Sequence, residues 1–266
     1  MGTPDAAFDV DESHRHLIFL TFIRMLFRLK EPKINFFTDP LPQGPNDGQE
    51  HILYALNSLA RSPVAVSSMC GRSELRHIAN QAQLFHIGHL AASSDLINIL
   101  YPAIRFFAGT RGIHNDFKSV HLLVAALATA NQASIRKLIY HCAQILALVR
   151  RYPTGWIYEP FIVFHAGIIL FLTAGLIPPP CSSAVAGATL QLDDIEVTRY
   201  TSPSAKIATW VRDGGDKVIS LDRIPVLCCR EGRQELLEYT AELLKRGGWE
   251  IGREFVKLLF LFRDPI

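Results

Sequence analysis

Histidine offers the most versatile chemistry in this sequence, and His86 and His89 have its most suggestive spacing. Two side chains three residues apart lie on the same face of a helix, where imidazoles can converge on a metal ion. Glu74 and His77 precede the pair on the same predicted helix. The segment lacks the carboxylate spacing of a HExxH or ExxH metal motif, however. We therefore expect two histidines of a packed helix and no metal site.

The five cysteines are scattered and offer neither a disulfide framework nor a zinc site. Their number is odd, and no two have the CxxC spacing that lets two thiolates share one metal ion. His141 stands next to Cys142, but the sequence shows no third residue that would orient the imidazole as a base. We expect free, mostly buried thiols at Cys70, Cys142, Cys181, Cys228 and Cys229.

One acidic run, Asp193-Asp194-Ile195-Glu196, is similar to the aspartate-rich magnesium site of all-α isoprenoid enzymes. Carboxylates in such a site recur four residues apart, so that one helix face can bind the ion. Val197 occupies that next position here, and the GxSxG and GxxxxGK[ST] motifs are also missing from the sequence. We expect no catalytic, metal-binding or cofactor-binding residues. An all-helical enzyme of secondary metabolism remains the alternative.

The composition excludes two classes of protein. The 266 residues include 27 Lys and Arg against 25 Asp and Glu, a net charge of +2, which is too small for a strongly basic nucleic-acid module. Hydrophobic residues make up 49% and charged residues 20%, so the chain is not intrinsically disordered. We expect a protein with a sizeable core and no direct contact with nucleic acid.

Apolar residues recur with helical spacing along most of the chain, whereas the strand signals are too short to assign. The pattern predicts an all-α protein, a multi-helix globular bundle of roughly nine to ten helices in one domain spanning residues 1–266. Loops are expected near residues 32–48 and 178–203, which are rich in turn-forming or small residues. The clearest predicted helices cover residues 9–30, 73–92, 134–149, 160–177, 204–212, 231–246 and 249–262.

The most apolar predicted helix is the segment Phe161–Ile177. At 1.5 Å per residue it would rise roughly 26 Å, which is less than the hydrocarbon core of a bilayer. No cluster of Lys and Arg marks one end of it as cytoplasmic. We expect this segment to be the buried apolar central helix of the bundle and the chain to make no contact with a membrane. A membrane-associated helical protein is the second alternative.

Two stretches resemble the middle homology region of fungal binuclear zinc cluster transcription factors. In residues 135–174, a helix with Cys, Ala and aliphatic residues leads through a Pro-x-x-Trp break to an aromatic helix with a central Ala-Gly. Residues 223–259 are similar to C-terminal segments of that family, where a proline-containing loop, a Gly-Arg helix start and a Trp-Gly-like break precede a last helix. The first stretch matches at Cys142, Ala143, Ile145, Leu146, Pro153, Trp156, Phe161, Phe164, Ala166 and Gly167.

The DNA-binding module of that family has no counterpart in this sequence. The module holds two zinc ions with six closely spaced cysteines, whereas this chain has five scattered ones. The resemblance therefore implies a fragment of a longer protein or a divergent member without the DNA-reading part. No residue of this chain is expected to bind DNA.

The function implied by the resemblance is that of a non-catalytic regulatory domain. Such a domain controls transcription of a metabolic or secondary-metabolite pathway and works in the nucleus, although this chain carries no basic import signal. It would respond to a small-molecule effector, a transcriptional co-regulator or a second copy of itself. An effector pocket is typically apolar with a few polar groups, and the candidates to line one here are His86, His89, Trp156 and His165.

Overall fold

The computed structural model describes residues 12–30, 47–61, 71–92, 132–178, 189–195 and 200–263. Its first three helices are α1 (Glu12–Lys30), α2 (Asp47–Arg61) and α3 (Arg72–Ala92). All three agree closely with the apolar periodicity of the sequence. The predicted loop over residues 32–48 lies almost wholly outside the described residues, and residues 93–131 lie wholly outside them.

Two long helices form the middle of the chain. Helix α6 (Gln132–Arg151) ends just before Pro153, and α7 (Glu159–Ala174) begins with a proline in its first turn, where the missing N–H group costs nothing. The loop between them carries Trp156 and Ile157, which are 37% and 79% exposed. Both helices were predicted, although α7 ends three residues earlier than expected.

The C-terminal part adds three helices and one small strand pair. Helices α8 (Ala205–Asp213), α9 (Arg230–Arg246) and α10 (Glu250–Leu261) follow the prediction to within a residue or two at each end. Strand β1 (Leu190–Gln191) pairs in parallel with β2 (Ile219–Ser220). The first strand falls in the region predicted to be a loop, because two residues are too few to show a period of two.

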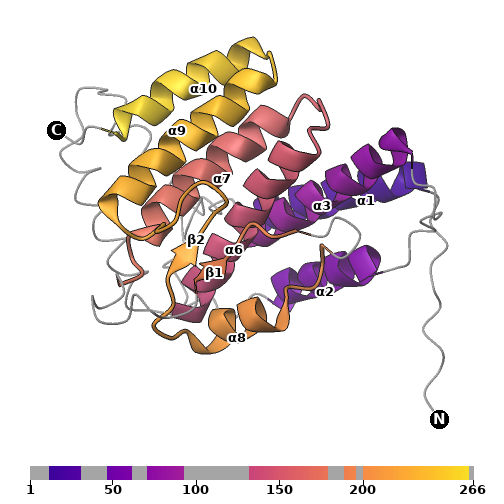
Figure 1. Ribbon diagram of the computed structural model, residues 1–266. Helices are drawn as coiled ribbons and strands as arrows, with labels where there is room; N and C mark the ends of the chain where they lie inside the picture. The colour runs from indigo at the N-terminus through magenta and orange to yellow at the C-terminus, as the bar shows by residue number, and fades with distance from the viewer. Residues whose placement is uncertain are drawn as a thin grey trace, which may run out of the picture.

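The prediction of a mostly helical protein is confirmed, with eight helices within the described ranges. In Figure 1, α7, α9 and α10 pack against one another, α6 packs against α7, and α3 joins α1 and α2 to α6. The total of nine to ten helices and a single domain over the whole chain stay predictions. None of the described helices has both the length and the apolar content needed to cross a membrane.

Among the described helices, the longest uninterrupted buried run lies in α6, not in the most apolar helix. Every residue from Leu138 to Val149 is buried, whereas α7 leaves Phe161 43% exposed and Phe171 and Leu172 partly exposed. The reason lies in their neighbours, since α6 contacts α3, α7, α8 and α9, and α7 contacts α6, α9 and α10. The central position of α7 therefore stays a prediction.

The apolar core is divided into two main clusters that meet at α6. The larger one joins α6 to α7, α8, α9 and α10, and the smaller one joins α1, α2 and α3 to the far side of α6. A row of buried or half-buried polar side chains runs along the contact of α3 with α6 and the start of α7. We call this row the seam, and its members are Asn80, Gln83, His86, His89, His141, Tyr158 and Glu159.

Candidate functional site

Three histidines from two helices meet inside the seam. His86 Nδ1 of α3 lies 2.8 Å from His141 Nδ1 of α6, which is a hydrogen-bonding distance. The ring of His89 stacks on His141 with centroids 4.4 Å apart and planes 7° from parallel. All three rings are buried, with 0%, 8% and 4% of their surface exposed for His86, His89 and His141. We call these three residues the histidine trio.

The hydrogen bonds of the histidine trio restrict where its protons can lie. His89 Nε2 is 3.3 Å from Asn57 Oδ1 of α2, so this nitrogen donates. The contact of His86 with His141 holds one proton, and we assign it to His86 Nδ1. The opposite assignment would leave an N–H at His86 Nε2, which is buried without a partner. His141 Nδ1 is then the acceptor.

Burial keeps the histidine trio neutral. Desolvation lowers the pKa of His86 from 6.5 to about 3, with a smaller effect of His89. Desolvation also lowers the pKa of His89 to about 3, helped by the nearby positive charge of Lys137. The pKa of His141 falls well below 6.5 because of burial, and then because of His89, His86 and Lys137. At neutral pH the seam therefore contains three uncharged imidazoles.

This arrangement suits hydrogen bonding between neutral imidazoles more than activation of a nucleophile. The neighbouring Cys142 is fully buried, which raises the pKa of its thiol and keeps it protonated. Because the rings of His89 and His141 are stacked and nearly parallel, their nitrogen atoms do not converge on a common point where a metal ion or substrate could bind. In the part of the chain that the structure describes, no group of three or more His, Cys, Asp or Glu residues is arranged to hold a metal ion.

Glu159 is a buried carboxylate at the other end of the seam, with only 1% exposure. Its Oε1 accepts hydrogen bonds from Gln83 Nε2 at 3.1 Å, Thr154 N at 3.0 Å and Thr154 Oγ1 at 3.1 Å. Its Oε2 accepts one from Gly155 N at 2.9 Å. The carboxylate thus fixes the α6–α7 loop and ties α3 to the first turn of α7.

Replacing Glu159 by glutamine is expected to lower the free energy of unfolding by about 1 to 3 kcal/mol. The new NH₂ group would face at least one buried N–H or O–H donor that now has an acceptor. Urea denaturation measures the effect, and Glu238→Gln, which changes an exposed residue of α9, serves as the control. Equal stability of the two variants would contradict this role of Glu159.

The structure brings two of the four candidate effector residues together and leaves the others elsewhere. His86 and His89 share one helix face, as their spacing predicted, and both contact His141. The ring of Trp156 lies against His16 of α1, with centroids 4.5 Å apart and planes tilted by 33°. On α7, His165 Nδ1 is 2.6 Å from Phe161 O, and burial lowers the pKa of His165. Within the described ranges, the ring contacts and hydrogen bonds of Trp156 and His165 are with residues outside the histidine trio.

His141 is the site residue that the sequence reasoning missed. The sequence alone gave its imidazole no orienting partner, whereas the fold supplies His86 from 55 positions away. A signal was present, because His141 lies among the regularly spaced apolar residues Leu138, Cys142 and Ile145. A histidine on the apolar stripe of a helix is placed to be buried, and a buried imidazole needs a partner.

The acidic run at residues 193–196 does not form a magnesium site in the described residues. Asp193 is 1% exposed, and its Oδ2 lies 3.2 Å from Arg150 Nη2 of α6. Both its oxygens also accept from Asp222 N at 3.1 Å. Asp193 therefore holds the strand pair and the following turn against α6, while Glu196 lies outside the described residues.

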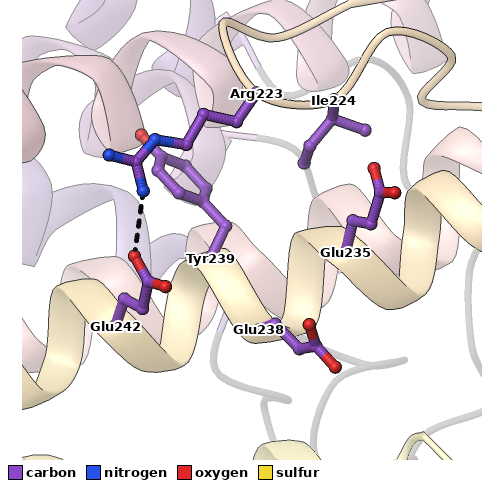
Figure 2. A pocket seen from close by; sticks show the side chains of 6 residues that line it. All are labelled: Arg223, Ile224, Glu235, Glu238, Tyr239 and Glu242. Carbon is purple, nitrogen blue, oxygen red and sulfur yellow. Dashed lines mark hydrogen bonds and ion pairs between the residues drawn. The ribbon is translucent and has the colours of Figure 1, made fainter.

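A hollow of about 110 Å³ lies on the outer face of α9 (Figure 2). Two of the three carboxylates that line it have arginine partners, because Arg223 binds Glu242 at 3.1 Å and Arg263 binds Glu238 at 3.2 Å. In Figure 2, Glu238 points away from Arg223 and Glu242. The hollow contains none of the four candidate effector residues, and its lining consists of Arg223, Ile224, Glu235, Glu238, Tyr239 and Glu242.

Comparisons with protein-family models, with curated proteins and with solved structures give no match to this chain. The resemblance to fungal transcription factors thus rests on the sequence positions named above. The seam is a feature of the fold that these sequence positions do not include.

Proposed function

We propose that this chain is a non-catalytic regulatory domain of the kind found in fungal zinc cluster transcription factors. It controls transcription of a metabolic or secondary-metabolite pathway and acts in the nucleus. Its input is a small-molecule effector, a transcriptional co-regulator or a second copy of the chain.

The observation that supports this proposal is the seam between two apolar clusters. The free energy of a buried polar contact changes strongly when one partner changes, because the other partner is then left buried without a hydrogen bond. Helices α1–α3 reach α6 and α7 through His86–His141, His89–His141, Gln83–Glu159 and Asn80–Tyr158. An effector that binds one arrangement of the seam more tightly would shift the population of the whole domain.

A reporter assay tests the proposal directly. The chain is fused to an unrelated DNA-binding domain in fungal cells that carry the matching reporter promoter. We expect the fusion to change reporter output relative to the DNA-binding domain alone. We also expect the double variant His86→Leu/His141→Leu to alter that output at equal protein level, because it replaces the polar contact by an apolar one.

The matched control is His51→Gln, which changes an exposed histidine of α2. The unfused chain is expected to show no salt-dependent binding to duplex DNA in a shift assay. A fusion whose output equals that of the DNA-binding domain alone would contradict the proposal, and so would submicromolar DNA binding at physiological salt. Catalytic turnover that depends on the histidine trio would instead favour the helical enzyme.

A further inference from the structure

We propose that the histidine trio is a proton-sensitive joint: protonation of His86, His89 and His141 opens the seam and releases α1–α3 from α6, while α7, α9 and α10 stay packed. This inference is independent of the proposed role in transcription, because it concerns only the folded chain and the proton.

The hydrogen bond between His86 and His141 carries the first step. Both Nδ1 atoms face each other at 2.8 Å and share a single proton. A second proton on His141 Nδ1 would place two N–H groups against each other, so that an attraction becomes a repulsion. A proton on His86 Nε2 would instead create a buried N–H⁺ at an atom that has no partner.

The surroundings offer little to stabilise an imidazolium. Lys137 of α6 adds like charge to His89 and His141, and the Tyr140 phenol, 6.0 Å from the ring of His86, is kept protonated by burial. From α2, the approaching polar group is the neutral amide of Asn57.

Three further polar or charged groups of the neighbouring helices have interaction partners outside the trio. The carboxylate of Glu159 on α7 is taken by Gln83, Thr154 and Gly155. On α1, His16 pairs with Asn80, and Arg15 interacts with Tyr200. A proton in the trio therefore meets no described carboxylate, and its charge is relieved when the seam opens to water.

The direction of the pH effect follows from the protonation of the two states. In the closed state of the seam, the pKa values of the trio are lowered, to about 3 for His86 and His89. In the open state, the pKa of each imidazole returns toward 6.5. The open state binds more protons, so falling pH favours it. Between about pH 6 and pH 4, each linked histidine should raise the opening constant about tenfold per pH unit, and three should raise it about a thousandfold.

The joint lies between the two clusters, which is why we expect a local opening. In the described segments α8, α9 and α10 contain no histidine, and their packing rests on aliphatic and aromatic side chains such as Trp210 and Leu237. Helix α7 contains His165, but its Nδ1 lies 2.6 Å from Phe161 O, so this hydrogen bond is within α7 and not between helices. Falling pH thus weakens the attachment of α1–α3 before it weakens the packing of α7, α9 and α10 against one another.

Hydrogen exchange of the full chain, followed by mass spectrometry and corrected for intrinsic rates, tests the inference. Between pH 7.5 and pH 5 we expect α3 and α1 to lose protection while α9 and α10 keep theirs. His141→Gln retains an acceptor for His86 but takes up no proton, so the opening constant should rise only about a hundredfold per pH unit. His51→Gln, the exposed control, should behave as the unaltered chain.

Three results would overturn the joint. The first is that the α3 amides keep the same protection from exchange over this pH range. The second is that the amides of α9 and α10 lose protection together with those of α3. The third is an unchanged proton dependence in His141→Gln. If His141→Gln does not fold, His89→Gln replaces it. NMR titration of the imidazoles in the unaltered chain gives a further check. A pKa near 6.5 for the trio in the closed state would also reject the proposal.

Discussion

The Arg150→Met variant is expected to lose about 3 kcal/mol of its free energy of unfolding. The guanidinium of Arg150 joins α6 to the segment after β1 by pairing with Asp193, at 3.2 Å, and with Asp222. Asp193 is 1% exposed, so removal of the arginine leaves a buried carboxylate without its counter-charge. The loss is measured by urea denaturation at neutral pH.

Two further variants separate the buried charge from the general effect of losing an arginine. Asp222→Asn removes the exposed partner, and we expect a change below about 1 kcal/mol. Adding Asp193→Asn to Arg150→Met neutralises the stranded carboxylate, and the double variant should regain part of the loss. If Arg150→Met is no less stable than Asp222→Asn, Arg150 does not hold the strand pair against α6.

Helix positions could be predicted because their signals are local. Pro153 and Pro160 bracket the loop between α6 and α7, and Ser204 caps α8 by accepting a hydrogen bond from Ile207 N at 3.4 Å. Gly247 and Gly248 separate α9 from α10. Each signal acts within a few residues, so a single sequence contains all of it.

The seam could not be predicted, because its partners are far apart in the chain. Gln83 and Glu159 are separated by 76 positions, and Asn57 and His89 by 32. The sequence showed Glu159 only as a lone charge before an apolar run, which looks the same whether the carboxylate is exposed or buried. Tertiary packing alone decides which polar groups on α3 meet α6 and α7.

Some positions of the family resemblance have a packing reason in this fold. Ala166 is fully buried, and a Cβ atom at Gly167 would lie 2.4 Å from Thr240 Cγ2 of α9. The small pair therefore lets α7 and α9 approach closely. Cys142 and Ala143 are likewise 0% exposed in α6. Packing constraints of this kind are compatible with many functions, which is why they support a shared fold more than a shared activity.

Gly232→Ala is expected to cost about 3 kcal/mol of the free energy of unfolding, at the upper end for an overpacked site. Gly232 belongs to the Gly-Arg helix start in the second stretch of the resemblance, in the first turn of α9. A Cβ atom there would lie 1.9 Å from the carbonyl oxygen of Val226, which is backbone and cannot rotate away. The turn would have to shift, together with Cys229, whose Sγ caps α9 by accepting from Gly232 N at 3.2 Å.

Gly71→Ala is the matched control for this variant, since a Cβ atom at Gly71 meets nothing within 4 Å. We expect the control to stay within about 0.5 kcal/mol of the unaltered chain. Thermal and urea denaturation of both variants measure the difference, and exchange of the α9 amides shows whether the loss starts at this turn. Equal stability of the two alanine variants would mean that the loop before α9 yields easily. In that case glycine at position 232 would need an explanation other than close packing.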